Sequence, residues 1–391
     1  MNLRMWAAAG LACSLALAGC GRGEGEAGSG DTLKLALVST LESRAYSLPF
    51  MEDSARAAVK ALNERGGVAG KTIELTVCND RNDQEELRRC LQSAVRDGAV
   101  GVVGLITSYG STAWPILEAA GLPALVPAPL QEIDGKSAMS YPLDSGSLNF
   151  VAFPEVARTY LKAESLVPVQ LDEAYAAAPF TGLKRGAEQS GTKVMGQVLI
   201  PPDAVDFAPY IARAKASGAA AIAGNVDAVN QVRLWQALKK SGTSMPLVIT
   251  NGIINPDMLK EGGAAAEGTV VVSANPFVPS DAPGVAAFAA EMKKFAPGKP
   301  ATSLGMRAWA GVQLAALAMK KIDGDVTRKS FVKALNSIDG ETVAWAEKVS
   351  FAKPGPVQDY PRIPSWTVYP GVIKGGAIKQ GEPVEAIKSG S

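Results

Sequence analysis

The sequence contains no histidine, and this absence narrows the functions open to the chain. Histidine is the commonest general base, a frequent zinc ligand and a member of the Ser-His-Asp triad, so enzymes and metal sites of those kinds are excluded. Catalysis by carboxylate, lysine or tyrosine side chains remains possible, but the sequence contains no paired-carboxylate or activated-nucleophile motif. We therefore predict a protein that is not an enzyme and that uses no metal or other cofactor.

Neither sign of charge is in excess. The 391 residues include 39 Lys and Arg against 38 Asp and Glu, and the first 19 residues contain a single charge, Arg4. Without that segment the two counts are equal, so the basic surface typical of a nucleic-acid-binding protein is missing. We predict no nucleic-acid partner.

The apolar run at the N-terminus, Met5 to Leu17, is shorter than the roughly 20 residues of a membrane span but suits a secretory signal. Leu17-Ala18-Gly19-Cys20 looks like a bacterial lipobox, and residues 21–30 are a Gly-rich segment typical of a flexible tether. We predict a signal peptide over 1–19, a lipidated tether over 20–30 and a periplasmic location, with the membrane contacted only through Cys20. An ordinary signal peptide with a chance cysteine is the alternative.

Of the four cysteines, Cys13 leaves with the signal and Cys20 is lipidated, so Cys78 and Cys90 remain. One follows an apolar strand and the other lies in the next helix. In an oxidising compartment we expect a disulfide between them that stabilises the fold by roughly 3 kcal/mol. Two buried free thiols are the alternative.

After the tether, short β-rich runs alternate with segments of helical periodicity, which is typical of parallel sheets covered by helices. The predicted strands are 33–38, 73–77, 100–105, 124–126, 167–171, 194–199, 219–223 and 247–250. The predicted helices between and after them are 50–64, 83–96, 112–120, 148–161, 180–189, 207–216, 228–241, 282–295, 303–322 and 327–337. We expect 270–273 to be a crossing strand and the Pro-rich segment 354–370 to be irregular except at 366–369.

The sequence Asn63-Glu-Arg-Gly-Gly-Val-Ala-Gly-Lys71 joins the first helix to the second strand. It resembles the N-x-x-G-G-(I/V)-x-G-(K/R) signature of type I periplasmic binding proteins, the leucine/isoleucine/valine-binding group that serves ATP-driven importers. Asp80, residues 104–111, Pro127-Ala128 and residues 303–318 follow in the order of that family, so the resemblance covers nearly the whole mature chain. A structural role nevertheless accounts for each glycine of the motif.

The resemblance implies an α/β fold with two Rossmann-like lobes, whose parallel central sheets are joined by a multi-strand hinge in the manner of a Venus flytrap. We expect one lobe to comprise 31–147 plus 275–348 and the other 148–274 plus 349–391. It also implies a monomer that closes on a small-molecule ligand and delivers it to an ABC permease in the cytoplasmic membrane.

In the first lobe, the polar loop that leaves the third strand and enters a helix can receive a carboxylate or carbonyl oxygen. Relatives that bind amino acids hold the carboxylate with a serine here, matched by Ser108, and with the backbone that Ala128 matches. Leu130 stands where those relatives commonly carry a threonine. The candidate residues of this lobe are Tyr46, Thr107, Ser108, Tyr109, Ser111, Ala128, Leu130 and Trp309.

In the second lobe, relatives place an acidic residue for the ligand ammonium where this chain has Thr250-Asn251-Gly252. The candidates here are Tyr175, Asn225, Asp227 and Asn251, and Asp227 is an alternative counter-charge. We therefore predict a ligand that is amino-acid-like, amide-like or an aromatic acid rather than a standard branched-chain amino acid. A periplasmic ligand sensor or carrier that feeds a membrane signalling partner is the alternative function.

Overall fold

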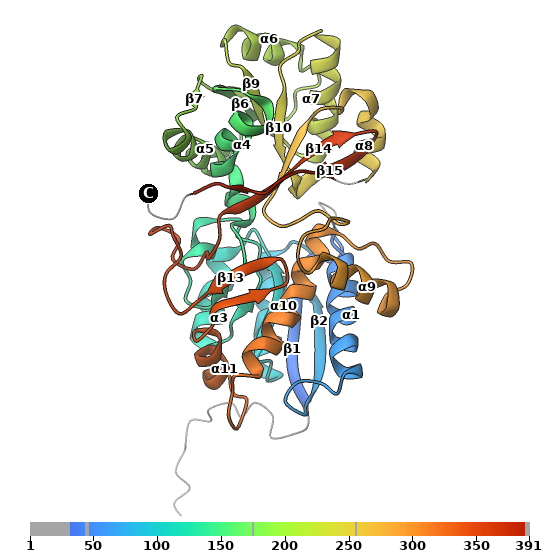
Figure 1. Ribbon diagram of the computed structural model, residues 1–391, viewed down its shortest axis with the longest axis vertical. Helices are drawn as coiled ribbons and strands as arrows, with labels where there is room; N and C mark the ends of the chain where they lie inside the picture. Colours follow the sequence, from blue (N-terminus) through green and yellow to red (C-terminus); the bar gives the residue numbers. More distant parts are fainter. Residues whose placement is uncertain (1–31, 44–46, 174–175, 255, 388–391) are drawn as a thin grey trace, which may run out of the picture.

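A computed structural model describes residues 32–43, 47–173, 176–254 and 256–387, which form two lobes stacked along the long axis (Figure 1). The predicted signal peptide, the tether with Cys20, and the candidate residues Tyr46 and Tyr175 lie outside the described residues. No helix in the described part of the chain is long and apolar enough to cross a bilayer.

The lower lobe of Figure 1 has a five-stranded parallel sheet of order β2-β1-β3-β4-β5. Both faces are covered, because alternate residues of β1 point to opposite sides. Leu35 and Leu37 pack in the core with α1 and α10, while Ala36 and Val38 pack in the core with α2 and α3. The strands are β1 (Thr32–Ser39), β2 (Thr72–Asn79), β3 (Gly101–Ile106), β4 (Ala124–Leu125) and β5 (Ser140–Tyr141). The helices are α1 (Phe50–Glu64), α2 (Gln84–Arg96), α3 (Gly110–Ala120), α9 (Val285–Phe295), α10 (Ser303–Met319) and α11 (Arg328–Leu335), and a hairpin of β12 (Asp339–Val343) and β13 (Ala346–Ser350) completes the lobe.

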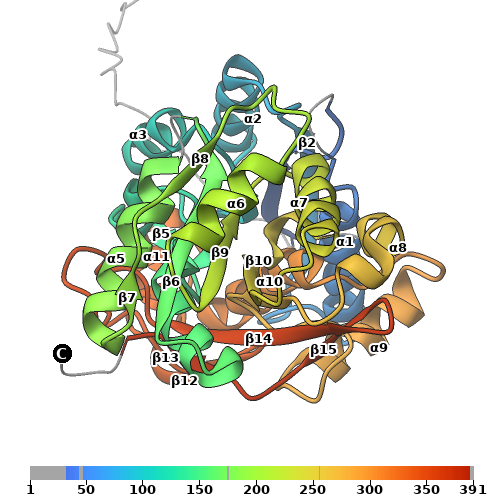
Figure 2. The same ribbon diagram turned by 90° about the horizontal axis from the view of Figure 1, so that it is seen from above.

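The upper lobe is built on a sheet of order β15-β14-β11-β10-β9-β6-β7, with β8 beside β6 and β16 beside β14. The strands are β6 (Ser165–Leu171), β7 (Lys193–Val194), β8 (Val198–Ile200), β9 (Ala221–Asn225), β10 (Leu247–Thr250), β11 (Val270–Ser273), β14 (Thr367–Lys374), β15 (Ala377–Gln380) and β16 (Val384–Glu385). The helices are α4 (Phe153–Val156), α5 (Ala177–Ser190), α6 (Ala208–Ala216), α7 (Ala228–Lys240) and α8 (Pro256–Gly262). Seen from above, β14 and β15 run along one side of the molecule (Figure 2).

The expectation that residues 270–273 cross between the lobes is wrong. These residues form β11, which is fully buried and pairs in parallel with β10 and antiparallel with β14. A strand buried on both faces needs neighbours on both edges to satisfy its backbone, and only the interior of a sheet supplies them.

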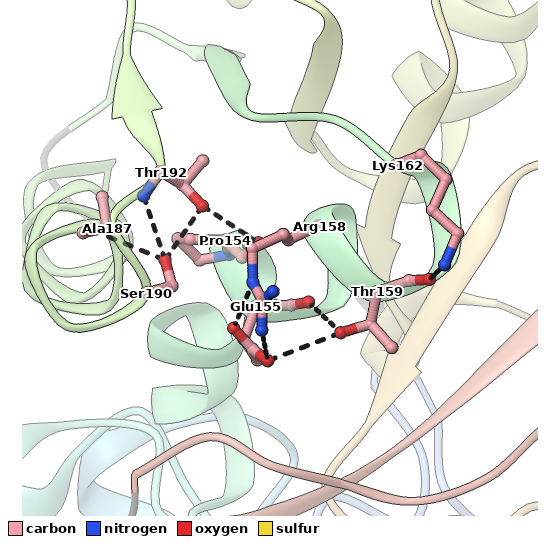
Figure 3. A network of polar contacts seen from close by, with 8 residues as sticks. All are labelled: Pro154, Glu155, Arg158, Thr159, Lys162, Ala187, Ser190 and Thr192. Atoms are coloured by element: carbon pink, nitrogen blue, oxygen red, sulfur yellow. Dashed lines mark hydrogen bonds and ion pairs between the residues drawn. The ribbon is translucent and has the colours of Figure 1, made fainter.

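The helix predicted over 148–161 is instead three short pieces: a 3₁₀ turn (Gly146–Ala152), α4 and a π turn (Ala157–Leu161). Figure 3 shows the polar contacts that hold this segment. Thr192 Oγ1 donates to the carbonyl of Pro154 at 3.4 Å, and Ser190 Oγ donates to Thr192 Oγ1 at 2.9 Å, so the segment is tied to the end of α5. Two further contacts within the segment, from Thr159 to Glu155 O and from Lys162 to Thr159 O, satisfy carbonyls near its end.

The motif at 63–71 has a structural role. The Asn63 side chain donates to Ile73 O and accepts from Ile73 N, both at 2.8 Å, and so joins the end of α1 to β2. Gly67 has φ +76°, and a Cβ there would lie 2.0 Å from Lys71 O, so only glycine fits. The predicted disulfide is confirmed: Cys78 at the end of β2 is bonded to Cys90 in α2.

The chain passes between the lobes three times. Leu143, Val285 and Phe351 pack in the core of the lower lobe, whereas Phe150 and Val272 pack in that of the upper lobe. The connecting residues are 144–149, 274–284 and 352–366, which we call the hinge segments.

Candidate functional site

The carboxyl ends of the parallel strands of the upper lobe, β6, β9, β10 and β11, face the lower lobe. Asn275, two residues beyond β11, donates from Nδ2 to the carbonyl of Ser303 at 2.6 Å, and Ser303 begins α10. The start of α10 in turn packs beside the start of α1, since a Cβ on Gly305 would lie 2.6 Å from Ser54 Oγ. Because α1 follows β1, the carboxyl ends of both sheets meet at one junction, where open α/β sheets bind ligands.

A buried carboxylate organises the first two loops of the lower lobe. Asp80, directly after β2, is 1% exposed and accepts from Thr40 Oγ1 at 2.6 Å and from Asn82 N at 3.0 Å. Burial raises the pKa of Asp80, and the hydrogen bond from Thr40 opposes that rise. Asp80 therefore fixes the loop after β1 and has a structural part in the site.

The start of α3 is an open polar position at this junction. Ser108 and Ser111 are exposed, and the N-cap residue, Tyr109, makes no side-chain hydrogen bond to the first turn of the helix. The Thr107 hydroxyl is buried and accepts from Tyr109 N at 3.0 Å. A helix N-terminus that lacks a side-chain cap presents N–H groups and a partial positive charge to a ligand oxygen. The structure therefore leaves Ser108 available, whereas Thr107 supports the turn.

In the loop after β4, several backbone N–H groups are already hydrogen-bonded within the protein. Ala128 N donates to Leu105 O at 3.0 Å, and Leu130 N donates to Asp134 Oδ2 at 2.8 Å. Asp134 Oδ2 also accepts from Gln131 N at 2.7 Å, and its Oδ1 accepts from Trp114 Nε1 at 2.6 Å. A carboxylate of the protein itself thus satisfies these N–H donors. Burial raises the pKa of Asp134, opposed by these hydrogen bonds.

Gln131 and Asp134 were not among the predicted site residues. Gln131 Nε2 donates to Ser108 O at 2.7 Å and so ties the loop after β4 to the start of α3. The three-residue spacing of Gln131 and Asp134, ahead of a 3₁₀ turn (Glu132–Gly135), is typical of a capping box and was the available signal.

Ser111 also borders a second surface. Together with Thr112 it lines a groove of about 790 Å³ between α2 and α3. Gln84 Nε2 donates to Thr112 Oγ1 at 2.8 Å, which fixes that hydroxyl against α2.

The candidates of the upper lobe follow β9 and β10. Asn225 is half-buried and donates to Gln170 Oε1 at 3.4 Å, and Asn251 is half-buried and donates to Ser273 Oγ at 3.3 Å. Asp227 is the N-cap of α7: one oxygen accepts from Asn230 N at 2.9 Å and the other from Asn230 Nδ2 at 2.7 Å. Its charge is therefore already engaged with the N-terminus of α7.

Trp309 lies in the core of the lower lobe. It is 4% exposed, its ring centroid is 5.7 Å from that of Phe288, and its Nε1 donates to Glu291 Oε2 at 2.7 Å. These contacts give the side chain a packing role between α9 and α10.

Comparison with known proteins identifies one family model and solved structures of the same fold. The family model described as periplasmic binding protein matches residues 32–359. A possible leucine/isoleucine/valine-binding protein from Rhodopirellula baltica superposes with a TM-score of 0.74 at 15% identity, covering 90% of this chain and 96% of that one. A fatty acid ABC transporter substrate-binding protein from Thermomonospora curvata gives 0.74 at 18% identity, covering 90% and 92%.

A branched-chain amino acid transporter substrate-binding protein from Streptococcus pneumoniae, in complex with isoleucine, gives a TM-score of 0.73 at 18% identity, covering 90% of this chain and 99% of that one. None of the curated proteins matches. The family match spans more than half of the chain, and the structures share its fold. The chain therefore belongs to the periplasmic binding protein family and has the type I fold of its leucine/isoleucine/valine-binding members.

Proposed function

We propose that this chain is a lipid-anchored solute-binding protein that captures a small molecule between its lobes and delivers it to an ABC importer. The observation that carries the proposal is the exposed, side-chain-uncapped start of α3 at the junction where the carboxyl ends of both sheets meet. Solved structures of the same fold are named as transporter substrate-binding proteins, which supports import.

The mechanism is hinge closure. A ligand that touches both lobes stabilises the closed arrangement, which a permease then distinguishes from the open one. The moving bodies in this proposal are the lower and upper lobes on either side of the hinge segments. No bond is made or broken.

The proposed ligand chemistry follows from the polar groups that the two lobes place at the junction. On the lower lobe, Ser108 and the start of α3 receive one carbonyl or carboxylate oxygen, while the loop after β4 is already occupied by Asp134. On the upper lobe the half-buried groups Asn225 and Asn251 are neutral amides. A desolvated ammonium without a counter-charge costs several kcal/mol, comparable with most of the roughly 8 kcal/mol of micromolar binding. The proposed ligand is therefore amino-acid-like, amide-like or an aromatic acid rather than a standard branched-chain amino acid.

A thermal-shift screen of the purified chain tests this ligand class. A ligand present at 100 times its dissociation constant adds about 2.7 kcal/mol to the free energy of unfolding. The informative set contains aromatic acids, their amides, and leucine, isoleucine and valine as zwitterionic controls. We expect the largest shift from an acid or amide; the largest shift from a branched-chain amino acid would contradict the proposed ligand class.

Anchoring and import need separate tests. Replacing Cys20 with alanine should move the protein from the membrane fraction to the soluble fraction, with Cys13→Ala as the matched control.

Cells that lack the protein should lose uptake of the radiolabelled ligand found in the screen. Unchanged uptake would contradict import and favour a sensor.

A further inference from the structure

A large cavity lies beside the hinge, apart from the candidate ligand site. It has a volume of about 850 Å³, within the range of small-molecule sites. Its walls come from both lobes and from the hinge segments: residues 143–144, 274, 279–283 and 345–347 on one side, and 365, 367, 369 and 377–383 on the other. In Figure 1 the β12–β13 hairpin of the lower lobe faces β14 and β15 of the upper lobe across this junction. Ser108, Ala128, Asn225 and Asn251 are not among its lining residues.

The lining carries an excess of negative charge. Four carboxylates, Asp144, Asp281, Glu347 and Glu382, line the cavity together with one ammonium, that of Lys379. The charge of Asp144 is balanced by Arg307, so the excess comes from Asp281, Glu347 and Glu382. Burial raises the pKa of the Tyr369 hydroxyl to about 12, and the charges of Asp144 and Glu347 add to that rise.

Asp144 is built into the wall with one oxygen unused. Its side chain is 2% exposed, and Oδ1 accepts from Arg307 at 2.6 Å and from Gly146 N at 2.8 Å. Oδ2 is buried and has no hydrogen-bond partner among the described residues. A buried carboxylate oxygen without a donor is costly, so a ligand N–H that reached it would be strongly favoured.

The remaining walls suit an organic cation better than a metal ion. No group of three His, Cys, Asp or Glu side chains in the described part of the chain is arranged to hold a metal. Trp345 and Tyr369 supply aromatic surface, and Leu143, Pro279 and Ile378 supply apolar surface. Aromatic rings beside carboxylates are the surroundings in which proteins bind ammonium groups on an apolar body.

We propose that the hinge cavity is a second binding site, for a small organic amine whose ammonium group meets Asp144 and Glu347 and whose apolar part lies against Trp345. Since its walls belong to both lobes, an occupant has different contacts in the open and closed arrangements and shifts the balance between them. The site is independent of the chemistry of the cleft ligand.

Three compounds that share one scaffold test the charge requirement. Phenethylamine is the cation, 2-phenylethanol the neutral analogue and phenylacetate the anion, each titrated calorimetrically into the full-length chain. We expect saturable binding of phenethylamine at millimolar concentration or below, and binding of the alcohol that is weaker by roughly tenfold. No saturable binding of the amine, or equal binding of the amine and the alcohol, would overturn the proposal.

Variants locate the site. Glu347 and Asp281 are exposed, so E347Q and D281N leave the buried Asp144–Arg307 pair intact and the chain folded. The double variant should weaken phenethylamine binding by roughly threefold to tenfold. Glu261→Gln, at an exposed carboxylate on α8, and Ser108→Ala, in the cleft, are the matched controls and should leave it unchanged. Unchanged affinity in the double variant would place the amine elsewhere and refute the hinge site.

Discussion

The two loops that bound the junction in the lower lobe differ in what their backbone N–H groups contact. The loop after β4 donates from Leu130 and Gln131 to Asp134, a carboxylate of the protein itself. The start of α3, joined to that loop through Gln131 and Ser108, has no side-chain cap. The comparison teaches that a loop whose donors are satisfied internally contributes rigidity, while its neighbour without a side-chain cap is the part that we propose for recognition.

The largest loss of stability is expected when the carboxylate of Asp134 is removed. In Asp134→Ala, the donors of Leu130, Gln131 and Trp114 lose their acceptor together, so we expect the free energy of unfolding to fall by about 3 to 5 kcal/mol. Urea denaturation measures the change. Glu132→Ala, an exposed neighbour, is the control and should cost less than about 0.5 kcal/mol. Similar losses in the two variants would show that Asp134 is not the anchor of the loop.

The isosteric change Asp134→Asn should cost less, about 1 to 3 kcal/mol, because the amide keeps one acceptor but turns its NH₂ toward a donor. The difference should also depend on pH. The pKa of Asp134 is raised in the folded state, so its contribution to stability falls as pH rises from the unfolded value of 3.8 toward the folded value.

The difference in free energy of unfolding between the wild type and Asp134→Asn should therefore be largest near pH 4 and smaller at pH 7. Urea denaturation of both proteins at the two pH values measures it. A difference that grows with pH would mean that the folded state favours the ionised carboxylate.

In the upper lobe, helix α7 has the side-chain cap that α3 lacks. Asp227→Ala removes the cap of α7 and should cost about 1 kcal/mol, the usual value for an N-cap. Thermal denaturation measures this loss. If ligand affinity fell as well, Asp227 would act in recognition in addition to capping.

The smallest effect on stability is expected at Ser108, beside the uncapped start of α3. Ser108→Ala should change the free energy of unfolding by less than about 0.5 kcal/mol, because the side chain is exposed. Affinity for the ligand found in the screen should nevertheless fall by roughly tenfold, the loss of one hydrogen bond to a charged or carbonyl oxygen. Ser337→Ala, at an exposed serine after α11, is the control. Unchanged affinity in Ser108→Ala would exclude this serine from the site.

Elements with strong periodicity were predicted closely. The range 50–64 coincides with α1, and 247–250 coincides with β10, because each carries an unambiguous apolar pattern between turn residues. The predicted strand 194–199 is split into β7 and β8, and the hairpin of β12 and β13 was missed. The hairpin exposes much of both strands, so its apolar pattern is weak.

The site was predictable only at the level of loops. Strand order places the loops of Ser108 and Ala128 side by side, since β3 and β4 are neighbours in a parallel sheet. Which N–H groups remain free depends on Asp134, whose side chain folds back onto Leu130 and Gln131.

The sequence by itself determined the alternation of strands and helices, the family, and the pair of cysteines available for a disulfide, because these depend on local pattern and on residue type. Only the tertiary structure decided which donors are satisfied, that Trp309 lies in a core, and that four carboxylates gather in a cavity beside the hinge. The physical reason is distance along the chain: Asp144, Asp281, Glu347 and Glu382 line one cavity only when two hinge segments and both lobes come together.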